Sequence, residues 1–177
     1  RFFFNGIMVC LGSSICSSGE AEIRSTVNQC WLRGDILTGE SLKNALYHDH
    51  IAYQNLTDNT SFTAASDHRS GSWYRLNRSC PKEEQIKGDI FTLSINHGKA
   101  PQNASYAYAV YAGVSSKDWE ETLSRAPVTV LRNDAKVQAV AFGSTVLCVF
   151  HEADRLDLPG NQHIAGSARS AVKQTLS

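Results

Sequence analysis

Few residues of this chain have the chemistry to bind a metal ion or to move a proton, and His48-Asp49-His50 comes first. Histidines at positions i and i+2 of a strand point to one face, where they could ligate a metal together. No partner at a recognisable metal-ligand spacing accompanies this pair. Solvent-facing or structural histidines are the favoured interpretation, and we predict no metal site.

His97 is the second candidate, because it is expected at the end of a strand, just before Gly98. A histidine in that place could serve as a general base near neutral pH. The interpretation that we favour is structural: His97 would hydrogen-bond to neighbouring backbone and fix a tight turn.

Trp73 and Arg75 form the third candidate, since both are expected on one face of the same strand. An aromatic ring beside a guanidinium suits stacking on a sugar and recognition of a carboxylate. Aromatic residues on a sandwich strand belong more often to the core, and we favour the core.

Motifs for covalent catalysis are missing from the sequence. It has no serine-nucleophile motif, no catalytic carboxylates at a fixed spacing and no phosphate-binding glycine loop. Its cysteines are odd in number and none forms a Cys-x-x-Cys pair, which argues against a zinc cage or a redox motif. We expect buried or lone thiols rather than a disulfide framework at Cys10, Cys16, Cys30, Cys80 and Cys148.

The charge balance excludes further classes of protein. The sequence has 17 Lys and Arg against 17 Asp and Glu, and no run of Lys and Arg. Such a chain is a poor general binder of polyanions, and we predict neither nucleic acid nor a membrane as a partner. No apolar run reaches the roughly 18 residues of a membrane span. The start at Arg1 has no Met and no signal-peptide pattern, so we expect the natural start upstream.

Alternating apolar residues predict a mainly β chain. Phe2-Phe3-Phe4 and 7–11 should pair as a hairpin through a type I′ turn at Asn5-Gly6. One helix is expected, over 115–125, with Ser115 and Asp118 as its capping box. Loops are expected at 55–61 and 154–166, and the last ten residues as coil or part of a strand. Further strands are expected at 22–33, 50–54, 71–77, 87–97, 105–111, 128–131, 137–142 and 145–150.

Strands that recur every 10 to 20 residues, with one helix among them, predict an all-β fold of antiparallel sheets in sandwich form. The helix and Pro127 form a natural connector between two domains. We therefore predict one domain over 1–125 and a second over 126–177.

Five segments, in order over residues 1–150, resemble polysaccharide lyase family 8, the lyases of chondroitin, hyaluronan and xanthan. Residues 1–15 (RFFFNGIMVCLGSSI) resemble its WFFFDDEIVCLGSGI, and 25–29 resemble its TT-(I/L)-x-Q, although Cys30 follows where the family has Arg. Residues 71–77 resemble G-x-W-x-x-I-N. Residues 96–108 resemble DHG…YAY, with Asn96 in place of Asp. Residues 128–140 resemble the opening of the family's C-terminal domain, and the closest similarity is to a chondroitin sulfate lyase.

The resemblance implies where the catalytic groups of such an enzyme lie. In the family an α/α toroid comes first and supplies an Asn, a His, a Tyr and an Arg, and an acidic residue comes from the early central β domain. None of these positions falls within this chain, and Tyr53, Tyr106, His97 and Arg75 do not match the motifs. We therefore predict no catalytic residue and no cofactor here, and we assign no substrate-binding residue.

The resemblance also implies a fold and a setting. Residues 1–125 would be the later half of an antiparallel super-sandwich, and 126–177 the beginning of a smaller C-terminal β-sandwich. The parent would be a secreted or periplasmic eliminase of uronic-acid glycosaminoglycans, in which this part packs on the toroid and on upstream sheets. The alternatives are a non-catalytic carbohydrate-binding or adhesion sandwich, and a metal-dependent β-sandwich enzyme that uses His48 and His50.

Overall fold

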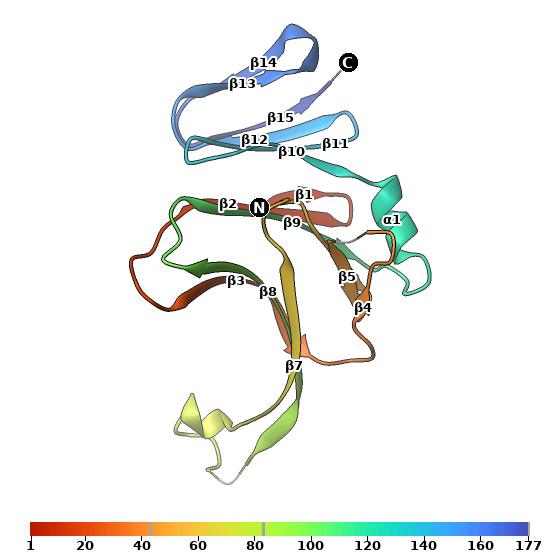
Figure 1. The fold of residues 1–177 in the computed structure, drawn as a ribbon, viewed down its shortest axis with the longest axis vertical. Helices are drawn as coiled ribbons and strands as arrows, with labels where there is room; N and C mark the ends of the chain where they lie inside the picture. The colour runs from red at the N-terminus through yellow and green to blue at the C-terminus, as the bar shows by residue number, and fades with distance from the viewer. Residues whose placement is uncertain (43, 83, 177) are drawn as a thin grey trace.

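The strands of this chain form a stack of antiparallel sheets. The computed structural model describes residues 1–42, 44–82 and 84–176. Within them, four sheets of six, four, three and two strands lie one above the other (Figure 1). The predicted all-β antiparallel sandwich with one short helix is therefore confirmed.

The six-stranded central sheet has the order β1-β2-β9-β6-β5-β4 and is apolar on both faces. In β2, Val9 and Leu11 pack toward one neighbouring sheet, whereas Cys10 packs toward the other. This follows from the period of two along a strand, which sends successive side chains to opposite faces. The strands are β1 (Phe2–Phe4), β2 (Ile7–Ile15), β9 (Ala104–Ala112), β6 (Ile51–Asn55), β5 (Ala45–His48) and β4 (Leu37–Thr38).

The three-stranded sheet covers one face of the central sheet. Its strands are β3 (Glu22–Trp31), β8 (Ile86–Lys99) and β7 (Phe62–Gly71), with β8 in the middle. Phe91, Leu93 and Ile95 of β8 have no exposed surface and pack inward against Tyr53, Cys10 and Tyr108. Each such side chain stabilises the fold by about 1.5–3 kcal/mol. The outer face of this sheet has no covering layer among the described residues.

The four-stranded sheet covers the opposite face of the central sheet. It consists of β10 (Val128–Asn133), β11 (Val137–Phe142), β12 (Thr145–Phe150) and β15 (Ser170–Thr175). Val128 and Val140 lie in one apolar cluster with Val9 and Ala109 of the central sheet. The two sheets therefore share a core, and the small alanine side chains of β9 allow this close packing.

A two-stranded sheet closes the far side of the four-stranded sheet, where the sequence predicted a loop over 154–166. That prediction is wrong. β13 (Asp154–Leu158) and β14 (Gln162–Gly166) pair around the short 3₁₀ turn η2 (Pro159–Asn161), in which Gly160 has φ 75°. Leu156 and Ile164 pack on Phe150 of β12, so tertiary burial selects the hairpin.

The helix α1 (Trp119–Arg125) begins later than predicted. Asp118 is its N-cap residue without a side-chain cap bond, and Ser115 Oγ instead accepts a hydrogen bond from the Lys117 N–H. The predicted capping box is therefore wrong. Trp119 and Leu123 anchor the helix in the shared core. No helix among the described residues is long and apolar enough to cross a membrane.

Two turns differ from the sequence prediction. The hairpin of β1 and β2 is confirmed, but of Asn5-Gly6 only Gly6 has a positive φ, so the turn is not type I′. The type I′ pattern occurs instead between β5 and β6, where Asp49 and His50 have φ values of 46° and 63°. Such values are uncommon for non-glycine residues, so pairing of the flanking strands must hold this turn.

The strand predicted over 71–77 is wrong as well. β7 ends at Gly71, and Trp73–Arg75 form the 3₁₀ turn η1 at the tip of the long β7–β8 arm (Figure 1). The chain must reverse here to become β8, and that requirement overrides the local alternation.

Candidate functional site

The structure separates the two histidines of the predicted metal candidate. His48 ends β5 and is buried, whereas His50 lies in the following turn and is exposed. The expectation of one strand and one face is therefore wrong. No group of three or more potential metal ligands occurs among the residues that the structure describes.

His48 contacts a cysteine that the sequence did not connect with it. Cys30 Sγ lies 3.9 Å from His48 Nδ1, and the Arg33 backbone N–H donates a 3.1 Å hydrogen bond to His48 Nε2. Burial lowers the pKa of His48 and raises the pKa of Cys30, so both groups are neutral near pH 7. Because Nε2 accepts a bond, the ring proton is on Nδ1, and no basic nitrogen faces the thiol. The contact is structural.

His97 lies near the end of β8, two residues before Lys99, but it does not fix a tight turn. Its Nε2 is 2.9 Å from Ser25 Oγ of β3. Its Nδ1 is buried and has no hydrogen-bond partner among the described residues. A serine–histidine pair used in catalysis has a third group that orients the ring, so this contact gives no support for a nucleophile. The prediction of no catalytic residue in this chain stays a prediction.

Trp73 is exposed, and its predicted place in the core is wrong. Together with Trp31 it borders a hollow of about 250 Å³ on the outer face of the three-stranded sheet. The two side chains are 53% and 48% exposed, which is unusual for the largest apolar residue type. We call this hollow the tryptophan groove; it is lined by Trp31, Arg69, Ser70, Gly71, Ser72, Trp73, Leu76, Ile86 and Ile90.

A glycine sets the position of the Trp31 ring. A Cβ atom on Gly88 would lie 2.4 Å from Cζ3 of Trp31, so the indole lies directly on the backbone of β8. Trp31 belongs to β3, and Gly88 pairs with Arg69 of β7. The indole thus lies across the middle strand toward Arg69, and a second hollow of about 550 Å³ continues from it along Gln29 and Cys30.

The segment from the end of β7 through η1 is rich in basic residues, although the whole chain is neutral. Residues 68–82 contain no Asp or Glu, and their cations are Arg69, Arg75, Arg78 and Lys82. Arg78 lies 4.7 Å above the ring of Tyr74, and Arg69 pairs with Asp67 at 2.9 Å. The sequence analysis missed this basic segment because its cations are spaced rather than consecutive. The sequence signal for the groove was Trp31, because it shares a strand face with polar Gln29.

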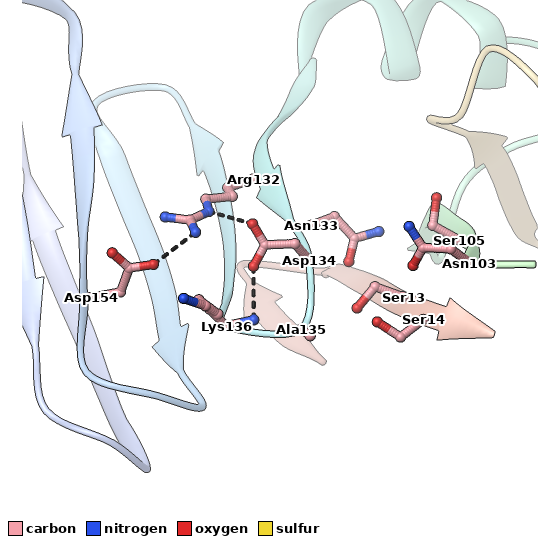
Figure 2. Close-up of a pocket in the computed structure, with 10 residues that line it drawn as sticks. All are labelled: Ser13, Ser14, Asn103, Ser105, Arg132, Asn133, Asp134, Ala135, Lys136 and Asp154. Atoms are coloured by element: carbon pink, nitrogen blue, oxygen red, sulfur yellow. Dashed lines mark hydrogen bonds and ion pairs between the residues drawn. The ribbon is translucent and has the colours of Figure 1, made fainter. Parts of the chain in front are cut away.

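A separate hollow, which we call the polar cleft, lies where the central and four-stranded sheets meet (Figure 2). Its volume is about 500 Å³. Asn133 joins the two sheets, because its Nδ2 donates to the carbonyl oxygens of Gly12 and Tyr106 at 3.1 and 3.0 Å. Its lining residues are Ser13, Ser14, Asn103, Ser105, Arg132, Asn133, Asp134, Ala135, Lys136 and Asp154.

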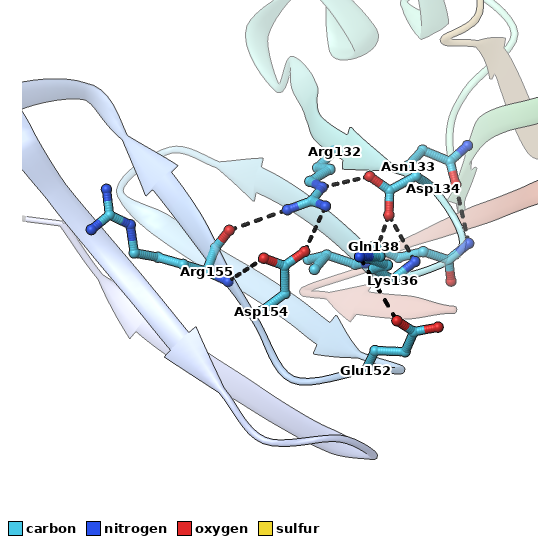
Figure 3. A network of polar contacts seen from close by, with 9 residues as sticks. Arg132, Asn133, Asp134, Lys136, Gln138, Glu152, Asp154 and Arg155 are labelled. Carbon is cyan, nitrogen blue, oxygen red and sulfur yellow. Dashed lines mark hydrogen bonds and ion pairs between the residues drawn. The ribbon is translucent and has the colours of Figure 1, made fainter.

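The charges in the polar cleft are bonded to one another (Figure 3). Arg132 binds both Asp134 and Asp154, the latter at 2.8 Å. Burial by itself raises the pKa of Asp134, but hydrogen bonds from Arg132 and from backbone N–H groups outweigh it, and the pKa is lowered. The pKa of Asp154 is lowered by hydrogen bonds from the Arg155 backbone and from Arg132. This network holds β10 against β13 and pairs the charges of Arg132, Asp134 and Asp154 with one another.

Fold and surface together define a multilayered antiparallel β-sandwich protein with an exposed aromatic groove. The family model described as "Polysaccharide lyase family 8, super-sandwich domain" matches residues 1–123. This chain therefore belongs to polysaccharide lyase family 8, and the resemblance seen in the sequence is confirmed.

Individual relatives agree with this assignment. Chondroitinase-AC of Pedobacter heparinus is 32% identical over 174 residues, which are 90% of this chain and 25% of that protein. Hyaluronate lyase HylB of Enterococcus faecalis is 28% identical over 159 residues, 78% of this chain and 16% of that protein. A solved structure of chondroitinase AC lyase from a study of oligosaccharide complexes superposes with a TM-score of 0.85 and 31% identity, over 98% of this chain and 28% of that one. The chain thus spans a quarter or less of the length of the curated relatives named here.

Proposed function

We propose that this chain is a non-catalytic β portion of a polysaccharide lyase that cleaves uronic-acid glycosaminoglycans, namely chondroitin sulfate or hyaluronan. The observation that carries the proposal is the match to Chondroitinase-AC along nearly the whole chain, at 32% identity. The superposition on a chondroitinase AC lyase structure over 98% of the chain supports it.

The reaction would be a β-elimination. A base removes the proton at C5 of the uronic acid, the bond from C4 to the bridging oxygen breaks, and that oxygen takes up a proton. The product is a sugar with a C4–C5 double bond, and no oxidant or organic cofactor takes part. This chain would leave these steps to other parts of the enzyme, since Tyr53 is buried with a pKa raised to about 12 and His48 faces a neutral thiol.

The role of this chain would be to support and complete the enzyme. This chain would pack on the toroid and on the upstream sheets of the parent. Residues 1–125 would belong to the central domain and 126–177 to the C-terminal one. A secreted or periplasmic location fits a polymeric substrate.

The test compares the full reading frame that contains this chain with the chain alone. Each is incubated with chondroitin or hyaluronan, and ultraviolet absorbance reports the unsaturated uronate. The longer protein should release product, whereas the isolated chain and a neutral glucan control should give none. Robust product from the chain alone would refute the non-catalytic role. No product from the longer protein on any uronic-acid polymer would refute the lyase assignment, and sugar binding without product would favour a carbohydrate-binding module.

A further inference from the structure

We propose that the tryptophan groove is a binding subsite for an acidic polysaccharide, in which Trp31 and Trp73 stack on sugar rings and Arg69 binds a uronate carboxylate. The substrate class rests on the proposed function, but the place of binding rests on the surface itself. Two indoles border one hollow and both remain about half exposed. Apolar sugar faces are suited to such rings, whose faces also carry partial negative charge.

The tryptophan rings of the groove are held in positions that allow a sugar ring to stack on them. Because the Trp31 indole lies on the Gly88 backbone, its inner face is covered and its outer face is presented to the hollow. Trp31 lies on β3 within a three-stranded sheet, which limits the entropy lost on binding. Trp73 borders the same hollow from η1, so rings from two different elements meet there.

The charge around the groove selects an anionic chain over a neutral one. Arg69 lines both adjoining hollows and uses one of its donors on Asp67. A guanidinium has five donors, so it can still bind a carboxylate in the bidentate manner. Arg75, Arg78 and Lys82 follow with no Asp or Glu between residues 68 and 82. Because Arg69 lines the hollow beside Trp31, a uronic acid stacked on that ring would bring its carboxylate near the guanidinium.

The size of the surface suits more than one sugar. The hollow between the tryptophans measures about 250 Å³, and the adjoining one about 550 Å³. They share Trp31, Arg69 and Ile90, and therefore adjoin at these residues. Their combined extent lies in the range of sites that bind small ligands. We infer that an oligosaccharide crosses Trp31 and continues on both sides of it.

Titration calorimetry of the 177-residue chain tests the proposal, with an unsulfated chondroitin hexasaccharide as the probe and cellohexaose as the neutral control. The acidic probe should bind more tightly. Trp31→Ala and Trp73→Ala should each weaken its binding about tenfold, whereas Trp31→Phe and Trp73→Phe keep a stacking ring and should restore most of it. Arg69→Gln should reduce the preference for the acidic over the neutral probe. The matched control is Phe3→Ala, which removes an exposed aromatic residue of the central sheet and should change nothing.

Activity of the longer protein gives a second, independent readout. There Trp31→Ala and Trp73→Ala should raise KM for chondroitin about tenfold and leave kcat nearly unchanged, as loss of uniform binding requires. If both variants bind and react like the wild type, or only lower the melting temperature, the groove does not bind the polysaccharide and the proposal fails. Equal binding of the two hexasaccharides also refutes it. Because product release by the wild type is scored separately, failure of the groove is distinct from failure of the lyase assignment.

Discussion

The tryptophan groove and the polar cleft are both open hollows. The charged side chains of the cleft are paired with one another, whereas the aromatic rings of the groove are exposed. In the polar cleft Arg132, Asp134 and Asp154 satisfy one another, and Asn133 bonds the backbone of two neighbouring strands. In the groove two large apolar rings remain exposed to water. Volume alone would favour the cleft, with 500 against 250 Å³. The exposed aromatic rings, rather than the volume, are the reason why we propose the tryptophan groove as the binding site.

The largest effect on stability is expected for Phe91, which lies beneath the tryptophan groove on the inner face of β8. Phe91→Ala should reduce the free energy of unfolding by about 3–5 kcal/mol, because the ring is fully buried and stacks on His48 at 4.2 Å between ring centroids. Urea denaturation measures this loss. Leu76→Ala, at a groove residue that is 80% exposed, is the control and should change stability by less than about 0.5 kcal/mol. Similar losses in both would contradict the distinction between inner and outer face.

A smaller loss of stability is expected from a substitution in the polar cleft. Asn133→Ala removes the donor to the carbonyls of Gly12 and Tyr106 and should cost about 1–3 kcal/mol of unfolding free energy. Oligosaccharide binding should stay as in the wild type. Asn59→Ala, in the exposed loop after β6, serves as the matched control for denaturation. Weakened binding in Asn133→Ala would mean that the two hollows are coupled.

The charge of Asp134 in the same cleft should make the stability of the fold depend on pH. Its pKa is lowered in the folded state, so the unfolded chain binds the proton more readily and stability rises with pH in the acid range. Asp134→Asn should therefore be less stable than the wild type above about pH 4, by less than about 1 kcal/mol because the carboxylate is half exposed. The difference should disappear as pH falls below the ordinary Asp value of 3.8. Urea titrations at pH 2.5, 4 and 7 would measure it, and a constant difference would exclude the ion pair as its cause.

The smallest effect on stability, but a clear one on binding, is expected at Gly88. Gly88→Ala places a Cβ atom against the Trp31 ring, which must turn away from the strand. Stability should change by less than about 1 kcal/mol, since an added Cβ also lowers the entropy of the unfolded chain. Affinity for the chondroitin hexasaccharide should fall about as far as in Trp31→Ala. Gly71→Ala meets no atom within 4 Å and is the control; equal effects on binding would remove the role of Gly88.

Residues with regular alternation were predictable from sequence, since burial on one face decides both the strand and its register. Phe91, Leu93 and Ile95 form the inward set of the strand that was expected over 87–97. The strands at 137–142 and 145–150 were predicted with the observed ends. The hairpin of β13 and β14 was missed because Asp154, Arg155 and Asp157 conceal the alternation of Leu156, Leu158 and Ile164.

The candidate sites were less predictable, because they depend on contacts far apart in sequence. Asn133 bonds the carbonyl of Gly12, 121 positions away, and Arg132 bonds Asp154, 22 positions away. The expectation that His48 and His50 share one strand face failed for a local reason, since the turn at Asp49 and His50 breaks the strand between them. Trp73 was assigned to the core because a single sequence does not show where a long hairpin ends.

The core shared by the central and four-stranded sheets has a thermodynamic consequence for the whole chain. Phe4 and Phe142 approach to 5.3 Å between ring centroids, and Val140 is fully buried beside Val9. Neither sheet can melt without exposing the apolar face of the other to water. We therefore expect calorimetry to record one cooperative transition across residue 125, with equal calorimetric and van't Hoff enthalpies. A domain boundary drawn in the sequence and the unit that unfolds together are then different divisions of the same molecule.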